Sequence, residues 1–217
     1  MEIKVIENVM QYNKQEAELN KNLLTKNNIF MINILSAPGA GKTSLILETI
    51  KELKELNDIN IGVIEGDIAS TFDSEKIKNL IDDVIQINTG GTCHLNASMI
   101  YKALEQMDLK KLNLIFIENV GNLICPVGFD LGENYRILIS SVSEGDDKPI
   151  KYPKAFIKTD LIVLNKIDMI KNSDFNITFF ENNVRKINSD VDILKLSCKT
   201  KDGFNQWINW VRDVLKR

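Results

Sequence analysis

A glycine-rich segment near the start of the chain has the residue types of a phosphate-binding loop. Residues 36–43 read Ser-Ala-Pro-Gly-Ala-Gly-Lys-Thr, which departs from G-x-x-x-x-G-K-[ST] only in the serine at the first position. Gly39 and Gly41 permit backbone conformations that turn successive N–H groups toward an anion. Lys42 supplies a cation for the outer phosphates, and Thr43 supplies a hydroxyl for Mg²⁺. A strand–turn–helix without a ligand is the alternative. We expect the nucleotide phosphates to be held by Gly39, Ala40, Gly41, Lys42, Thr43 and Ser44.

A second motif, in the last third of the chain, predicts which base is bound. Residues 165–168 read Asn-Lys-Ile-Asp directly after the apolar run 161–164. Guanine presents two adjacent donors, N1–H and its exocyclic amino group, and the Asp168 carboxylate offers a matching pair of acceptors. Adenine would leave that carboxylate unpaired, which strongly disfavours it. The stem of Lys166 can lie along the base, and Asn165 can brace the loop, so we expect GTP.

The segment after the last predicted strand completes this base site. Ser197, Cys198 and Lys199 stand where GTPases usually have Ser-Ala-Lys, whose backbone contacts the guanine oxygen. Cysteine in place of alanine is a small change. We interpret Cys198 as a structural thiol and not as a metal ligand.

Carboxylates at the ends of two other predicted strands are candidates for the magnesium site, because Mg²⁺ prefers hard oxygen ligands. Asp67 ends one strand and Asp73 lies in the polar segment after it; for either one alone, a solvated loop charge is the alternative. Glu118 ends the central strand, where Ras-type GTPases have D-x-x-G, and Gly121 can turn its N–H toward a γ-phosphate. The expected Mg²⁺ ligands are Thr43, Asp67, Asp73 and Glu118. The expected catalytic residues are Lys42, Asp73, Glu118 and Gly121.

A set of soft ligands indicates a second chemistry. Cys93 is followed by His94, the only histidine, in a loop that contains Gly90 and Gly91, and Cys125 lies shortly after Gly121. Thiolate and imidazole suit Ni²⁺ and Zn²⁺. Three ligands do not complete a four-ligand structural zinc site, but two copies of the chain meeting across a two-fold axis would do so. An ordinary Cys-His pair at a helix start and a buried cysteine before proline are the alternative.

Alternating strand and helix patterns surround these motifs. This order predicts an α/β fold with a mostly parallel sheet flanked by helices, as in phosphate-loop NTPases, and ligands beyond the carboxyl ends of the strands. One domain over residues 1–217 is the simplest division, with an amphipathic helical arm over residues 1–26. Strands are predicted over residues 29–35, 60–65, 84–88, 112–117, 135–142, 161–164 and 191–196, and helices over 45–56, 76–81, 95–107, 182–187 and 202–215.

Composition narrows the class of protein. The net charge of −3 gives no electrostatic basis for binding nucleic acid or an anionic membrane surface. No apolar run is long enough to span a bilayer, and the N-terminus has no signal-peptide pattern. Three cysteines are an odd number, which disfavours a disulfide framework. We therefore expect a cytoplasmic protein.

Several stretches together resemble the HypB family of hydrogenase-maturation GTPases, relatives of the urease accessory GTPase UreG. The resemblance covers nearly the whole chain. Its most specific stretches are residues 118–126 (Glu-Asn-Val-Gly-Asn-Leu-Ile-Cys-Pro), 88–90 with 93–95, and 144–149 with 151–153. The Cys-Pro-His of UreG is absent. The resemblance implies a SIMIBI-type phosphate-loop GTPase in which Cys93, His94 and Cys125 bind metal at a GTP-promoted homodimer interface.

The resemblance also implies partners and sets limits. It implies that other hydrogenase-maturation proteins and the hydrogenase large subunit are partners. Many bacterial members carry an N-terminal cysteine cluster or a histidine-rich tract that binds nickel, and neither occurs in these residues. Asn96 replaces a residue that is usually acidic in the family.

The predicted function is therefore a GTP-hydrolysing metallochaperone that holds Ni²⁺ or Zn²⁺ and assists nickel insertion into [NiFe]-hydrogenase. The cofactors expected are GTP or GDP, Mg²⁺, and Ni²⁺ or Zn²⁺. The alternatives are a GTP-switched regulatory scaffold with structural cysteines and a delivery GTPase that serves another nickel enzyme.

Overall fold

An all-parallel sheet forms the centre of the computed structural model, which describes residues 9–55, 59–67, 77–78, 80–81 and 83–216. Its spatial order is β3-β2-β4-β1-β5-β6-β7. β1 therefore lies between β4 and β5, and the chain crosses from one half of the sheet to the other there. The strands are β1 (Phe30–Ser36), β2 (Ile61–Asp67), β3 (Val84–Asn88), β4 (Leu114–Glu118), β5 (Tyr135–Ser141), β6 (Leu161–Asn165) and β7 (Asp192–Lys195).

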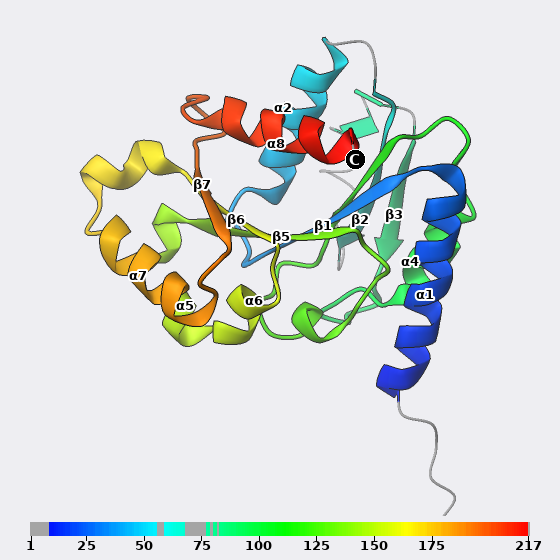
Figure 1. The fold of residues 1–217 in the computed structure, drawn as a ribbon, viewed down its shortest axis with the longest axis horizontal. Helices are drawn as coiled ribbons and strands as arrows, with labels where there is room; N and C mark the ends of the chain where they lie inside the picture. Colours follow the sequence, from blue (N-terminus) through cyan, green and yellow to red (C-terminus); the bar gives the residue numbers. More distant parts are fainter. Residues whose placement is uncertain (1–8, 56–58, 68–76, 79, 82, 217) are drawn as a thin grey trace, which may run out of the picture.

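Helices cover both faces of the sheet (Figure 1). One face carries α2 (Lys42–Lys54) and α8 (Phe204–Leu215), and the other carries the remaining α-helices. Strands covered on both sides have apolar residues at nearly every position, as β4 and β6 do. The remaining helices are α1 (Val9–Asn27), α4 (Ala97–Leu104), α5 (Lys148–Lys151), α6 (Pro153–Ile157) and α7 (Ile177–Ile187), with short 3₁₀ turns η1 (Pro126–Gly128), η2 (Val142–Glu144) and η3 (Ile167–Asn172).

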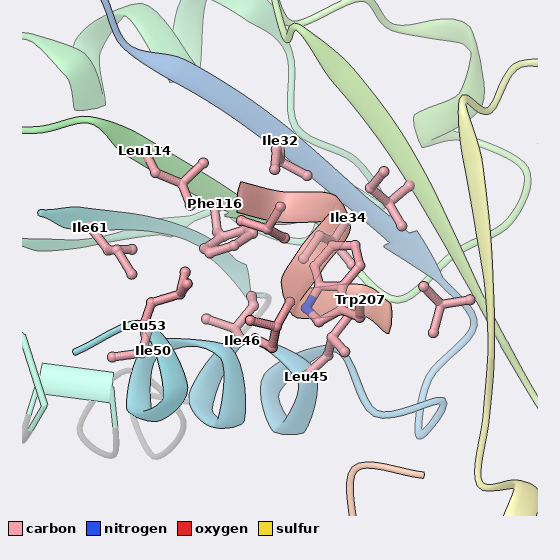
Figure 2. Close-up of a cluster of buried hydrophobic side chains, with 14 of the residues drawn as sticks. Ile32, Ile34, Leu45, Ile46, Ile50, Leu53, Ile61, Leu114, Phe116 and Trp207 are labelled. Carbon is pink, nitrogen blue, oxygen red and sulfur yellow. The ribbon is translucent and has the colours of Figure 1, made fainter. Parts of the chain in front are cut away.

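The contact of α2 and α8 with the sheet fixes the helix that follows the phosphate loop. Trp207 of α8 is fully buried beside Leu45 of α2 (Figure 2), and its indole N–H donates to Thr49 Oγ1 at 2.7 Å. Thr49 in turn donates to the Leu45 carbonyl at 2.6 Å. This polar link inside an apolar layer holds α8 against the first two turns of α2.

The predicted fold class is confirmed, and the sheet is wholly parallel. All seven predicted strands and the helices predicted over 45–56, 95–107, 182–187 and 202–215 occur, with ends shifted by a few residues. The short helix predicted over 76–81 lies partly outside the described residues. The N-terminal arm is helical from Val9 to Asn27, while residues 1–8 lie outside the described residues. The short helices α5 and α6 were not predicted. No helix among the described residues is long and apolar enough to cross a bilayer.

Candidate nucleotide and metal site

The phosphate loop joins the end of β1 to α2 in the conformation that its glycines require. Gly41 precedes α2 with φ 105°. A Cβ there would lie only 2.4 Å from Asn165 Nδ2, so both backbone and space demand glycine. Asn165 Nδ2 also donates to the Ala40 carbonyl at 2.9 Å. The loop for the phosphates and the loop for the base are therefore packed directly on each other.

Lys42 and Ser36 are paired inside this loop. Lys42 is 9% exposed, and its Nζ donates to Ser36 Oγ at 3.1 Å. Ser36 is fully buried and donates in turn to the Ala37 carbonyl at 2.6 Å. The serine that replaces the first glycine of the motif thus gives the lysine ammonium a buried acceptor within the phosphate loop.

Hard oxygen atoms meet beside the start of α2. Thr43 Oγ1 donates to Glu118 Oε1 at 2.8 Å, and Glu118 is 7% exposed. Glu65, which is 3% exposed, is aligned with Glu118 across the β2–β4 pair. Both carboxylates line a cavity of about 510 Å³ with the phosphate loop and Gly121. A hydroxyl with buried carboxylates is a donor set that fits Mg²⁺.

Sequence reasoning missed Glu65. Its signal was a charged residue at the fifth position of the strand, on the face shared with the buried Val63. Asp67 ends β2 as predicted, but its side chain and the whole of Asp73 lie outside the described residues.

The predicted base site forms a second cavity of about 500 Å³, lined by residues from both nucleotide motifs. Ser197 Oγ donates to Asp168 Oδ1 at 2.6 Å. Lys166, whose φ is 61°, donates from Nζ to the Gly39 carbonyl at 2.7 Å. Lys199 lies at the edge of the cavity, where its N–H donates to Ser197 Oγ at 3.2 Å. Ser44 lines both cavities.

Asn165 and Cys198 join the two loops that form the base site. Asn165 Oδ1 accepts hydrogen bonds from the N–H groups of Lys166 at 2.7 Å and Cys198 at 3.2 Å. The Cys198 thiol packs against the apolar layer under α2, and burial raises its pKa to about 12. Cys198 is thus a neutral packing residue at physiological pH.

Cys93 and Cys125 come together from different loops. A hydrogen bond between the two thiols raises the pKa of Cys125. His94 Nδ1 lies 3.9 Å from Cys93 Sγ. The His94 ring stacks on Phe129 at 3.9 Å, and burial lowers its pKa. Among the described residues no three His, Cys, Asp or Glu side chains converge as a set that could hold a metal ion.

Polar side chains shape the loops that carry these ligands. Asn122 Oδ1 accepts from the Ile124 N–H at 2.7 Å and the Cys125 N–H at 3.2 Å, which folds the segment after Gly121 into a tight turn. Asn96 caps α4, because its Oδ1 accepts from the Met99 N–H at 2.9 Å. An acidic residue at this position would provide the same acceptor, which explains how asparagine can replace it.

A buried amide connects the phosphate cavity to the Cys93–His94 loop. Asn119 follows Glu118 and is 1% exposed. Its Oδ1 accepts from the Val120 N–H at 2.9 Å and from the Leu95 N–H at 3.5 Å. The residue next to Glu118 therefore contacts the residue next to His94.

The same amide begins a chain of hydrogen bonds to the Cys125 loop. Asn119 Nδ2 donates to Asn33 Oδ1 at 3.2 Å, and Asn33 Nδ2 donates to Glu133 Oε1 at 3.0 Å. Glu133 is ion-paired with Arg136 at 2.5 Å, with side chains only 5% and 12% exposed. The Arg136 guanidinium donates to the carbonyls of Val127 and Phe129 at 3.2 and 2.9 Å.

Comparison with known proteins places this arrangement in a family. A family model described as CobW/HypB/UreG, nucleotide-binding domain, matches residues 30–195. The hydrogenase maturation factor HypB of Rhizobium leguminosarum bv. viciae is 40% identical over 209 residues, which are 96% of this chain and 69% of that protein.

Two solved structures agree with the fold and with the predicted resemblance. The crystal structure of HypB from Archaeoglobus fulgidus is 40% identical with a TM-score of 0.88, covering 94% of this chain and 99% of that one. HypB from Helicobacter pylori in complex with nickel is 32% identical with a TM-score of 0.89, covering 94% and 95%. The chain therefore belongs to the HypB hydrogenase maturation factors of the CobW/HypB/UreG nucleotide-binding family.

Proposed function

We propose that this chain is a GTP-hydrolysing nickel carrier that assists nickel insertion into [NiFe]-hydrogenase. The observation that carries the proposal is the contact between two sites: Asn119, next to Glu118 at the phosphate cavity, reaches Leu95, next to His94. A nucleotide-dependent movement of the Glu118–Gly121 segment would reach the soft ligands through it. The nickel complex of the Helicobacter pylori relative supports nickel as the cargo.

The nucleotide half of the proposal assigns a task to each group in the site. Asp168, held by Ser197 Oγ, is the acceptor pair for guanine, and Lys42 neutralises the outer phosphates. Thr43 and Glu118 hold Mg²⁺, and the carboxylate of Glu65, on the neighbouring strand, adds negative charge beside Glu118. When bound, the ion stabilises the charge that develops on the phosphate oxygens during transfer.

The nickel half rests on the donor atoms that the loops bring together. The Cys93 thiol lies close enough to Cys125 to raise the pKa of Cys125, and His94 Nδ1 lies 3.9 Å from Cys93 Sγ. Such soft and intermediate donors fit Ni²⁺, and also Zn²⁺, better than they fit Mg²⁺. Since one chain supplies an incomplete set, we propose that a second copy completes the site in a GTP-promoted homodimer.

The proposal also specifies the setting. The acceptors are the hydrogenase large subunit and the other maturation proteins that act on it. The protein works in the cytoplasm, where GTP is present and cysteines stay reduced. All 217 residues act as one GTPase domain, with α1 as its N-terminal arm.

Two variants separate the halves of this proposal. Lys42→Ala removes the cation at the phosphates, so phosphate release from GTP should fall to background. Cys125→Ala removes a thiolate, so nickel affinity should fall by roughly 10–100-fold or more while GTP affinity stays unchanged. Phosphate release with GTP and with ATP, and a nickel titration followed by thiolate charge-transfer absorbance, measure these effects. Near-normal turnover in Lys42→Ala would refute the phosphate site; unchanged nickel affinity in Cys125→Ala would remove the carrier role alone.

A further inference from the structure

Two asparagines lie on the buried face of α1, where an amphipathic helix normally has apolar residues. Asn13 is 5% exposed and Asn20 is fully buried. They share this face with Ala17 and Leu24, since spacings of three and four residues repeat on one side of a helix. Burying an amide is unfavourable unless it is hydrogen-bonded, so these side chains need partners that leucine would not need.

Each asparagine bonds to two separate segments of the chain. Asn13 Oδ1 accepts from the Ala97 N–H at 2.9 Å, and its Nδ2 donates to the Asp130 carbonyl at 2.8 Å. Asn20 Nδ2 donates to the Ala97 carbonyl and to the Leu131 carbonyl, both at 2.9 Å. One helix therefore ties the start of α4 to residues 130–131 at both ends of the Asn13–Asn20 face.

These two segments are the continuations of the ligand-bearing loops. Ala97 comes three residues after His94, and Asp130 comes five residues after Cys125. Gly132 adds a third point of attachment, since its φ is 84° and a Cβ there would lie 2.4 Å from the Ala17 carbonyl oxygen. Only glycine lets this loop backbone lie so close to α1.

We propose that Asn13 and Asn20 are positioning residues that set the spacing between Cys93 and Cys125. The inference rests on the proposed nickel site. A helix that merely covered the sheet would bury apolar side chains and would add no hydrogen bonds to the stacking of His94 on Phe129 that already joins the two loops. The asparagines instead fix the continuations of both loops to one rigid element, which keeps the two thiols close together before metal arrives.

The test measures thiol spacing without metal. A propyl-linked bis-methanethiosulfonate bridges two thiols only when they are close, and mass spectrometry reports the bridged chain. The full-length variants are Asn20→Ala, which removes both donors, and Asn13→Asp, which keeps the acceptor for Ala97 and loses the donor. Asn22→Ala, at an exposed position of the same helix, is the matched control. Cys93→Ser shows the background without a bridge.

The bridge should form about tenfold more slowly in Asn20→Ala and Asn13→Asp than in the wild type and in Asn22→Ala. Nickel affinity should fall by roughly 10–100-fold in the same two variants, as it does when groups that orient metal ligands are removed. The affinity for fluorescent GDP should stay unchanged in all of them, which shows that the nucleotide site is folded. Bridging at the control rate in both folded variants would overturn the inference. A wild type that binds neither nickel nor zinc would overturn the proposed function, and the bridging rates would still decide the positioning role.

Discussion

At the scale of single residues, the three cysteines differ in their surroundings, and this difference predicts their reactivity. Burial raises the pKa of Cys198 to about 12 because the thiolate would lose its hydration. At pH 8 only about one molecule in ten thousand would carry this thiolate, against about one in four for a free cysteine. Iodoacetamide should therefore modify Cys93 well before Cys198, and labelling of Cys198 should rise as the pH is raised toward 12.

Peptide mass spectrometry after timed labelling checks this order. Labelling in guanidinium chloride is the control, because unfolding exposes Cys198 and should remove the difference. Equal labelling rates for Cys93 and Cys198 in the folded protein at pH 8 would contradict the assignment of Cys198 as a partly buried, neutral packing residue.

Sequence reasoning could name candidate site residues where the chemistry lies in one continuous stretch. Lys42 and Thr43 follow one another at the end of the glycine-rich segment, and Asp168 belongs to a four-residue motif. Their local spacing is therefore enough to indicate a site. Glu65 and Asn33 could not be found in this way. Each acquires its role from a strand or side chain far away in sequence, through the β2–β4 register and through Asn119.

At the scale of elements, α8 packs against α2, and Trp207 is the largest fully buried side chain of their shared cluster. Trp207 fills the space between the two helices and the sheet (Figure 2) and donates to Thr49. Trp207→Ala should lower the free energy of unfolding by about 3–5 kcal/mol, because it leaves a cavity and removes a buried hydrogen bond. Urea unfolding followed by circular dichroism measures this change.

Trp210 provides the matched control on the same helix. It stacks on Trp207 with ring centroids 5.5 Å apart but is only partly buried. Trp210→Ala should therefore cost clearly less than Trp207→Ala. Equal losses in the two variants would show that the stability does not come from the buried indole.

The elements themselves were predictable to the extent that their apolar patterns are long. Apolar runs interrupted by a single asparagine, residues 29–35 and 112–117, predicted β1 and β4, and α8 followed from the spacing of its tryptophans. The helices α5 and α6 have four and five residues, too few for a helical period to emerge. The role of α1 could not be predicted either. An asparagine in a helix is expected at the polar surface unless its hydrogen-bond partners are known.

At the scale of the whole molecule, one polar network connects the proposed nucleotide and metal sites. Asn33 stands in its middle, between Asn119 beside the phosphate cavity and Glu133, which holds Arg136 against the Cys125 loop. A network of this kind inside the sheet has few alternative arrangements, because each buried amide must keep its partners. Movement at one end is therefore expected to change the other.

Coupling between two binding sites is reciprocal, and this gives a quantitative prediction. With Mg²⁺ present, a non-hydrolysable GTP analogue should change nickel affinity by a factor of about 5–150, and nickel should change the affinity for the analogue by the same factor. Asn33→Ala should move both factors toward one while each ligand alone binds almost as in the wild type. Isothermal titration of each ligand with and without the other measures all four affinities.

Asn182→Ala, exposed on α7, serves as the control. Wild-type coupling in Asn33→Ala would show that the linkage does not need Asn33 and runs through the Asn119–Leu95 contact or the Gly121–Cys125 backbone. No coupling in the wild type would leave two independent sites.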